Sequence, residues 1–253
     1  MTVPYSTKMD PTYENFAAEC PRPHCGASNI FNRASDLRTF QPIGLRTVNC
    51  QECDRPFNIG NDSVNAAHEM LLSDCFAFIG RKQYMQCVLG VAQAYEVFLS
   101  HVLHVQLIYR PFERDASPRS ECLNDLKKQL YARVGKLAFD DMRHLVLKLV
   151  VDNVEPASLA DAKAKIAKLP KKNVPKVERQ CVEQVPDERL KVLLLGLLDA
   201  NPNKLRNRVV HKDAYRPKLD EAKRAHDEAR EIIYGLTGRL GLGSFDRAAK
   251  NQS

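Results

Sequence analysis

The stretch Val88-Leu-Gly-Val-Ala-Gln-Ala-Tyr-Glu-Val-Phe-Leu-Ser-His-Val-Leu-His-Val-Gln-Leu107 decides the fold, because it is the most apolar segment of the chain. Polar residues interrupt it, among them Gln93, Glu96, Ser100, His101 and His104. A membrane-spanning helix needs about 20 nearly uninterrupted apolar residues. The segment therefore predicts a buried helix in a soluble helical domain, and no membrane span.

Helical patterns continue on both sides of this segment. The turn formers Gly60-Asn61-Asp62-Ser63 offer a helix N-cap, and apolar residues recur at helical spacing from Val64 onward. The same signals, together with Pro111 as a helix end, predict helices at 63–79, 81–108, 120–139, 140–153, 187–199, 203–213 and 217–240. The chain is therefore predicted to be mainly α.

The first 60 residues have a different character. They contain six prolines, show no helical periodicity, and include short strand-like pieces at Asn29–Asn32 and Leu45–Val48. We predict a small loop-rich domain at 1–60, an α-helical domain at 61–245 and a C-terminal tail at 246–253.

Composition narrows the cellular setting. The 253 residues carry a formal net charge of +7 and include eight cysteines. The segment Met1–Asp10 lacks the apolar stretch of a secretory signal, so we expect a cytoplasmic protein in a reducing compartment. The chain has neither a P-loop nor a Gly-x-Ser-x-Gly elbow, which argues against kinases, ATPases and serine hydrolases. In a reducing compartment, cysteine spacing indicates metal ligation before disulfides.

Four cysteines form two close pairs. The first pair lies in Cys20-Pro-Arg-Pro-His-Cys25-Gly26 and the second in Cys50-Gln-Glu-Cys53, with 24 residues between the pairs. Two such pairs are typical of a tetrahedral Zn²⁺ site, because each pair lies on a tight turn that directs two sulfurs at one point. We expect the intervening residues to form a hairpin that brings the two turns together. Four sulfurs leave no position for a reactive water, so the predicted zinc is structural.

This segment resembles a zinc ribbon whose first knuckle is longer than usual. Gly26 permits the backbone turn that follows the second sulfur. His24 is the alternative ligand to Cys25, although a fourth sulfur fits the knuckle better. The remaining cysteines have no metal spacing and are predicted to be buried, inert thiols: Cys75, Cys87, Cys122 and Cys181.

A basic segment runs from Lys163 to Arg179, with seven basic residues and a single acid, Glu178. Its first interpretation is a solvated loop or a short polar helix. Its alternative interpretation is a contact with nucleic acid.

A second motif lies in Asn201-Pro-Asn-Lys-Leu-Arg-Asn-Arg-Val-Val-His-Lys212. Arg206 and His211 are five residues apart, which places them about 140° apart around an ideal helix. Asn207 and His211, four residues apart, share a face. From spacing alone, such residues are ordinary surface or capping groups.

The pattern Arg206-Asn207-x-x-x-His211 resembles the active-site motif of the HEPN superfamily (higher eukaryotes and prokaryotes nucleotide-binding). The upstream segment Gln86–Leu99, with Glu96, is similar to the long second helix of that superfamily. The resemblance covers roughly residues 63–240. It implies an all-α HEPN-like bundle, and a metal-independent endoribonuclease that acts on RNA as a homodimer in toxin or phage-defence systems.

The resemblance also implies roles for the residues. His211 would transfer protons, and Arg206 would hold the phosphate. Asn207 would orient His211 or the phosphate by hydrogen bonding, and Glu96 would hold Arg206 in place. For Glu96, a purely structural pairing with a helix neighbour is the alternative. Some toxin members have a tyrosine two residues after the histidine, where this chain has Asp213, and the nearest tyrosine is Tyr215.

Two other functions remain open at this level. In the first, Arg206 and His211 grip phosphate without cleaving it, so the protein is a nucleic-acid- or nucleotide-binding module. In the second, the zinc ribbon docks a protein partner or regulator.

Overall fold

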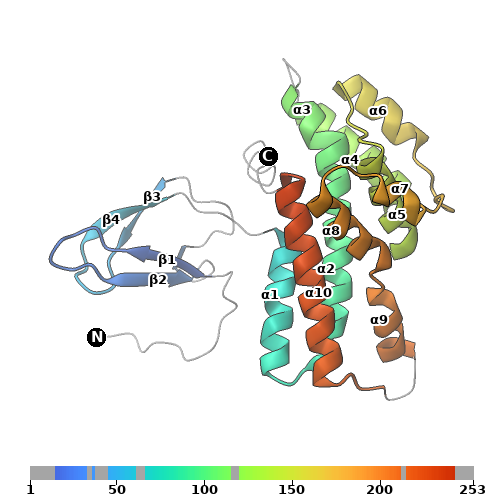
Figure 1. Cartoon of the computed structure of the whole chain (residues 1–253). Coiled ribbons are helices and arrows are strands. Elements are labelled where there is room, and N and C mark those ends of the chain that lie inside the picture. Colours follow the sequence, from blue (N-terminus) through green and yellow to red (C-terminus); the bar gives the residue numbers. More distant parts are fainter. Residues whose placement is uncertain are drawn as a thin grey trace. The chain divides into compact units, whose positions relative to one another are not determined.

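The computed structural model describes residues 15–32, 36–37, 45–60, 66–114, 120–211 and 215–242. The chain forms two compact units, Met1–Ala66 and Ala67–Ser253 (Figure 1). The predicted domain boundary at residue 60 falls just before the undescribed residues 61–65, and the predicted tail 246–253 lies outside the described residues.

The first unit contains two antiparallel hairpins. Strand β1 (Asn15–Glu19) pairs with β2 (Ser28–Asn32), and β3 (Leu45–Asn49) pairs with β4 (Pro56–Gly60). The two predicted strand-like pieces are confirmed as β2 and β3. The predicted hairpin between the cysteine pairs is wrong, because among the described strands β2 pairs only with β1 and β3 only with β4. Each cysteine pair instead lies in the turn of its own hairpin.

Two amide side chains join the hairpins. The Asn29 side chain is fully buried, and its Oδ1 accepts a hydrogen bond of 2.6 Å from the backbone N–H of Gln51. The Gln51 side chain donates to the carbonyl of Ile30 at 2.8 Å and accepts from its N–H at 3.2 Å. Gln51 therefore bonds β2 as the backbone of a neighbouring strand would.

The second unit is helical, so the mainly α prediction is confirmed. Its elements are α1 (Ala67–Gly80), α2 (Tyr84–His104), the π-helix η3 (Val105–Tyr109), α3 (Arg110–Arg114), α4 (Ser120–Val134), α5 (Phe139–Val151), α6 (Leu159–Lys168), α7 (Arg179–Glu183), α8 (Glu188–Asp199), α9 (Pro202–His211) and α10 (Leu219–Arg239). Helix α2 is central and contacts α1, α5, α9 and α10 (Figure 1). Its side chains Phe98, Leu99 and Val102 are fully buried, as expected from its apolar sequence.

The helix predicted to end before Pro111 continues through it. At the end of η3 the N–H of Arg110 bonds to the carbonyl of Val105, five residues back. Pro111 consequently falls in the first turn of α3, where its missing N–H costs little. The continuous segment Tyr84–Phe112 is, by length and composition, able to cross a membrane, although 56% of its most apolar window is buried inside the protein. Core helices of soluble proteins share these properties.

Candidate helical site and metal centre

Helix α9 begins where the sequence provides a cap. Asn201 accepts a hydrogen bond from the N–H of Lys204 at 3.0 Å, and Pro202 occupies the first helical position, where no N–H is needed. No residue of α9 is buried. All of its side chains are therefore at least partly accessible.

The outer face of α9 carries the predicted catalytic motif. Arg206, Asn207 and His211 are all exposed. Arg206 Nη1 donates to Asn207 Oδ1 at 3.0 Å. Within the described ranges, neither Arg206 nor His211 forms an ion pair with an acidic side chain. Both groups are consequently available to an anion.

Glu96, the fourth predicted site residue, is exposed on α2. The described residues show no hydrogen bond or ion pair between Glu96 and Arg206. Tyr215 is engaged elsewhere, since its hydroxyl donates to Glu221 and its ring lies 3.8 Å from the guanidinium carbon of Arg208. Asp213 lies outside the described residues.

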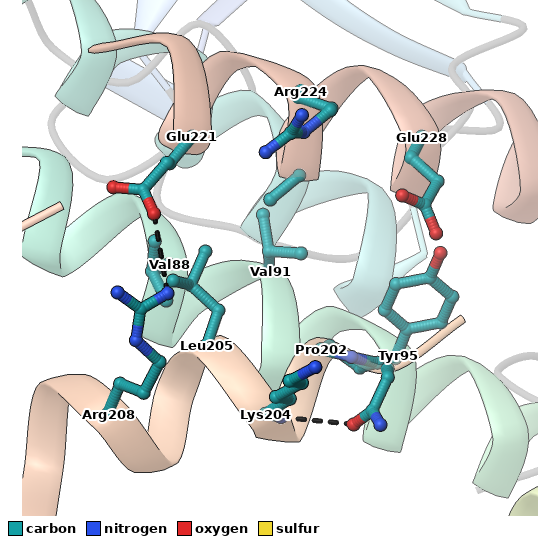
Figure 2. Close-up of a pocket in the computed structure, with 12 residues that line it drawn as sticks. Val88, Val91, Tyr95, Pro202, Lys204, Leu205, Arg208, Glu221, Arg224 and Glu228 are labelled. Atoms are coloured by element: carbon teal, nitrogen blue, oxygen red, sulfur yellow. Dashed lines mark hydrogen bonds and ion pairs between the residues drawn. The ribbon is translucent and has the colours of Figure 1, made fainter. Parts of the chain in front are cut away.

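Other residues of α9 border a pocket that the sequence analysis missed (Figure 2). The pocket encloses about 210 Å³ between α2, α9 and α10. Its walls include Val88, Val91 and Tyr95 of α2, Lys204, Leu205 and Arg208 of α9, and Glu221, Arg224, Ala225 and Glu228 of α10. The sequence feature that could have indicated this pocket is the spacing of Glu221, Arg224 and Glu228, which places three ionisable side chains on one face of α10.

The ionisable groups of the pocket have different environments. Glu221 Oε1 lies 3.5 Å from Arg208 Nη1. The pKa of Glu221 is held below its usual range mainly by the hydrogen bond from Tyr215 and, to a smaller extent, by that from the Lys218 N–H. Burial raises the pKa of Glu228. Burial also raises the pKa of Tyr95, whose hydroxyl has no hydrogen-bond partner in the structure.

The basic segment 163–179 is partly neutralised. Three of its cations pair with acids, in the pairs Lys163–Asp125, Lys165–Asp161 and Arg179–Asp199. The connection between α6 and α7 is fixed to α5, because Val174 N–H donates to Asp141 and Val177 N–H donates to His144. The other four lysines are exposed: Lys168, Lys171, Lys172 and Lys176.

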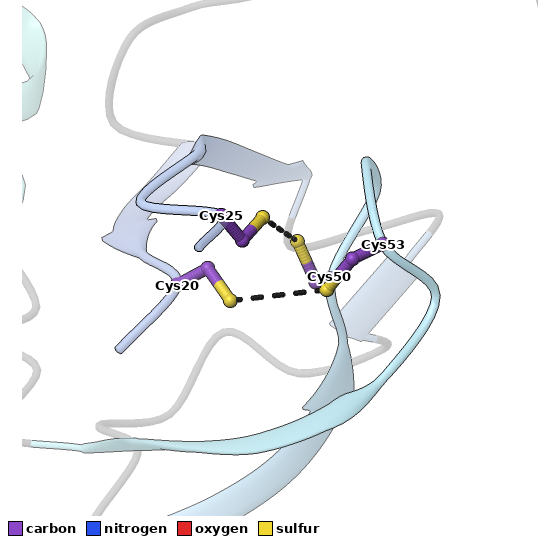
Figure 3. Close-up of side chains that lie close together, drawn as sticks. All are labelled: Cys20, Cys25, Cys50 and Cys53. Atoms are coloured by element: carbon purple, nitrogen blue, oxygen red, sulfur yellow. Dashed lines mark hydrogen bonds between the residues drawn. The ribbon is translucent and has the colours of Figure 1, made fainter. Parts of the chain in front are cut away.

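The four predicted zinc ligands come together in the first unit (Figure 3). The Sγ atoms of Cys20 and Cys53 are 4.0 Å apart, those of Cys25 and Cys50 are 3.7 Å apart, and all four lie within 4.8 Å of one another. Tetrahedral zinc with Zn–S bonds of about 2.3 Å separates its sulfurs by roughly 3.8 Å. The cluster is therefore compatible with a tetrahedral metal ion. His24 is exposed and does not belong to it.

The two knuckles have the same backbone construction. Cys20 N–H bonds to Ala27 O at 2.8 Å, and Cys50 N–H bonds to Arg55 O at 3.0 Å. The residue after the second sulfur has a positive φ in both, +59° at Gly26 and +53° at Asp54. Gly26 has the left-handed conformation expected of it, and Asp54 takes that conformation with a short polar side chain.

The thiols of the cluster are electrostatically coupled. The pKa of Cys50 is lowered to about 6, mainly by a hydrogen bond from the N–H of Cys53. The pKa of Cys25 is raised to about 12, because burial and the three neighbouring sulfurs outweigh the hydrogen bond from Ala27 N–H. Cys50 thus loses its proton readily, whereas the negative charge of neighbouring thiolates opposes deprotonation of Cys25. A bound cation would offset the repulsion between the thiolates.

The remaining cysteines divide into two groups. Cys75 and Cys87 are fully buried, as predicted. The prediction is wrong for Cys122 and Cys181, which are exposed on α4 and α7.

Comparisons of the chain with protein-family models, with curated proteins and with solved structures gave no match.

Proposed function

We propose that this protein is a cytoplasmic, metal-independent endoribonuclease of the HEPN type that works as a homodimer. The observation that supports it is the outer face of α9, where Arg206, Asn207 and His211 are exposed together and free of acidic partners among the described residues. A phosphate requires such a face, with cations not already neutralised.

The chemistry needs no catalytic metal. The RNA 2′-oxygen attacks the adjacent phosphorus and the 5′-oxygen leaves, which yields a 2′,3′-cyclic phosphate and a 5′-hydroxyl. His211 accepts the proton of the 2′-hydroxyl or donates one to the leaving oxygen. The guanidinium of Arg206 stabilises the negative charge on the pentacoordinate phosphorus. Asn207 orients that guanidinium through its 3.0 Å hydrogen bond. Glu96 has no assigned role.

A second copy supplies the other wall of the site. Arg206 and His211 are about 140° apart on the helix, and both can border one groove when a second copy supplies its other wall. Val210 lies between them in the helical projection and is 48% exposed. In the proposed homodimer, Val210 lies at the contact between the two α9 helices.

The second part of the proposal is that the four-cysteine cluster binds structural Zn²⁺ as a ribbon. The sulfur distances and the paired knuckles support it. Four thiolates close the coordination sphere, so the metal supports folding and RNA or partner recognition and takes no part in cleavage.

The proposal is tested by incubating RNA with purified wild type and His211→Ala protein in magnesium-free buffer that contains no chelator, because a chelator would also remove the zinc of the ribbon. Lys223→Ala, which alters an exposed residue of α10 outside both the motif and the ribbon, is the control. We expect Lys223→Ala to cleave like wild type, and His211→Ala to be at least about 100-fold slower. Products should end in cyclic phosphate. Equal rates for wild type and His211→Ala, or no cleavage by wild type, would contradict the catalytic proposal.

A non-catalytic nucleic-acid-binding module is the second candidate, favoured by the four exposed lysines between Lys168 and Lys176. In that case wild type and His211→Ala bind RNA without cleaving it, and the affinity of both falls steeply as salt rises.

A further inference from the structure

The pocket between α2, α9 and α10 plays no part in the proposed RNA chemistry. From α9 it is lined by Lys204, Leu205 and Arg208 (Figure 2) and not by Arg206, Asn207 or His211. A cavity of roughly 150 Å³ holds benzene. The 210 Å³ enclosed here therefore has room for one ring with small polar substituents.

The middle of the pocket is apolar. Val88 and Val91 project from α2 toward Leu205 of α9, and Ala225 of α10 completes this wall. An apolar wall of this kind favours binding of a hydrophobic ring or short chain and forms few favourable contacts with an extended phosphodiester backbone.

The pocket carries a net positive charge, because three cations and two carboxylates line it. Arg208 is paired with Glu221. The charge of Arg224 also lowers the pKa of Glu221 and opposes the rise that burial causes in the pKa of Glu228, but Lys204 and Arg224 form no ion pair within the part of the chain that the structure describes. Asn201 and Pro202, at the amino end of α9, also line the pocket, and the helix dipole adds partial positive charge there. These groups favour an anion.

A second polar anchor lies beside Glu228. The Tyr95 side chain is 2% exposed, its hydroxyl has no hydrogen-bond partner among the described residues, and it points toward the Glu228 carboxylate (Figure 2). A buried hydroxyl without a partner is uncommon and indicates a group that completes it. Glu228 is one turn of α10 beyond Arg224, about 6 Å along the helix axis.

We propose that this pocket binds a small organic anion. Its carboxylate or phosphate lies against Lys204 and Arg224, its ring or short apolar body lies against Val88, Val91 and Leu205, and its hydroxyl bonds to Tyr95 and Glu228. The proposal goes beyond RNA cleavage and does not depend on it.

The test is calorimetric titration of the full chain with four probes. Two are hydroxylated anions, 4-hydroxybenzoate and 4-hydroxyphenyl phosphate. The third, 4-hydroxybenzyl alcohol, lacks the charge, and the fourth, benzoate, lacks the hydroxyl. We expect saturable binding of at least one hydroxylated anion, and weaker binding of the alcohol and of benzoate.

Three variants locate the binding. Arg224→Gln should weaken binding of the hydroxylated anion about tenfold or more, whereas Lys223→Gln, at the next and exposed position, should bind like wild type. Tyr95→Phe keeps the ring, so it should weaken the hydroxylated anion and leave benzoate unchanged. Circular dichroism verifies that each variant is folded.

Three results would overturn the proposal. The first is the absence of saturable binding of either hydroxylated anion to folded wild type. The second is equal affinity in Arg224→Gln and Lys223→Gln. The third is binding of the neutral alcohol as tightly as the anions. None of these readouts involves RNA, so failure here and failure of the nuclease proposal are distinguishable.

Discussion

Gly90 brings the backbone of α2 against a buried sulfur of α1. A Cβ at this position would lie 2.6 Å from Cys75 Sγ, and Cys75 is fully buried with its thiol donating to Cys87 O. The sulfur has little room to move. Alanine is the better helix former by about 1 kcal/mol, yet overpacking costs about 1–3 kcal/mol.

We therefore expect Gly90→Ala to lower the free energy of unfolding, as measured by urea denaturation. The same substitution should cost less in a Cys75→Ala background, where the sulfur is gone. A Gly90→Ala protein more stable than wild type would contradict the packing argument.

His68 makes the stability of the helical unit depend on pH. His68 is 1% exposed, and its Nε2 has no hydrogen-bond partner in the described part of the chain. Desolvation, with a smaller effect of His101, lowers its pKa to about 4. The unfolded chain, with a histidine pKa of about 6.5, binds the proton first. Stability is therefore present above pH 6.5 and is lost as the pH falls toward 4.

At pH 5 this loss amounts to about 2 kcal/mol for His68. We expect His68→Leu to lose correspondingly less stability than wild type between pH 7 and pH 5, in chemical denaturation at each pH. His104 and His144 also have lowered pKa values through burial, but they are present in both proteins and cancel in the comparison. Parallel pH profiles would refute the role of His68.

Residue spacing predicted the four-cysteine cluster but not the pocket. Cys20, Cys25, Cys50 and Cys53 could be grouped from sequence because short turns force the two members of each pair together. Tyr95 could not be assigned to a pocket, because the pocket exists only where three helices distant in sequence meet. Their packing angles depend on side chains throughout the core, which local patterns do not encode.

At the scale of elements, apolar periodicity located most of the long helices. Helices α2, α5, α8 and α10 lie where it predicts them, within a few residues. The prediction failed where a local exception decides the outcome. Pro111 was taken as a helix end because the π-helical bond that accommodates it leaves no mark in the sequence. Strand β1 was missed because Asn15-Phe-Ala-Ala-Glu19 lacks β-branched residues.

The link between the hairpins predicts an effect on metal affinity. Gln51→Ala removes the two side-chain hydrogen bonds to Ile30, each worth about 0.5–1.5 kcal/mol. Because the hairpins must meet to assemble the site, we expect Zn²⁺ affinity to fall by about tenfold, measured by competition with a chromophoric chelator. Glu52→Ala, at the next exposed position, is the control. Equal affinities in the two variants would mean that the metal alone joins the hairpins.

At the scale of the whole molecule, the two units have very different cores. Among the described residues, the buried cluster of the first unit contains only Cys20, Phe31, Leu37, Cys50, Phe57 and Ile59, two of which are proposed metal ligands. The helical unit has an extensive apolar core of its own. The first unit should therefore depend on its metal, and the second should not.

We expect a strong chelator, or Cys50→Ser, to unfold the first unit while the helical circular dichroism signal remains. Amide resonances of β1–β4 would collapse to unfolded positions, and those of α1–α10 would stay dispersed. Zinc content of the purified wild type gives an independent measurement. Loss of helical signal on chelation would contradict the independence of the two units, and a metal-free, folded first unit would contradict the zinc proposal.

Helix α9 has no buried residue, and this affects how mutations can accumulate on it. Because α9 buries no residue, a change of side chain on its outer face removes nothing from the core and should leave thermal stability nearly untouched. Selection can thus alter the chemistry of this helix without first compensating a loss of folding. In the laboratory, a variant of Arg206, Asn207 or His211 that loses activity would report on chemistry and not on unfolding.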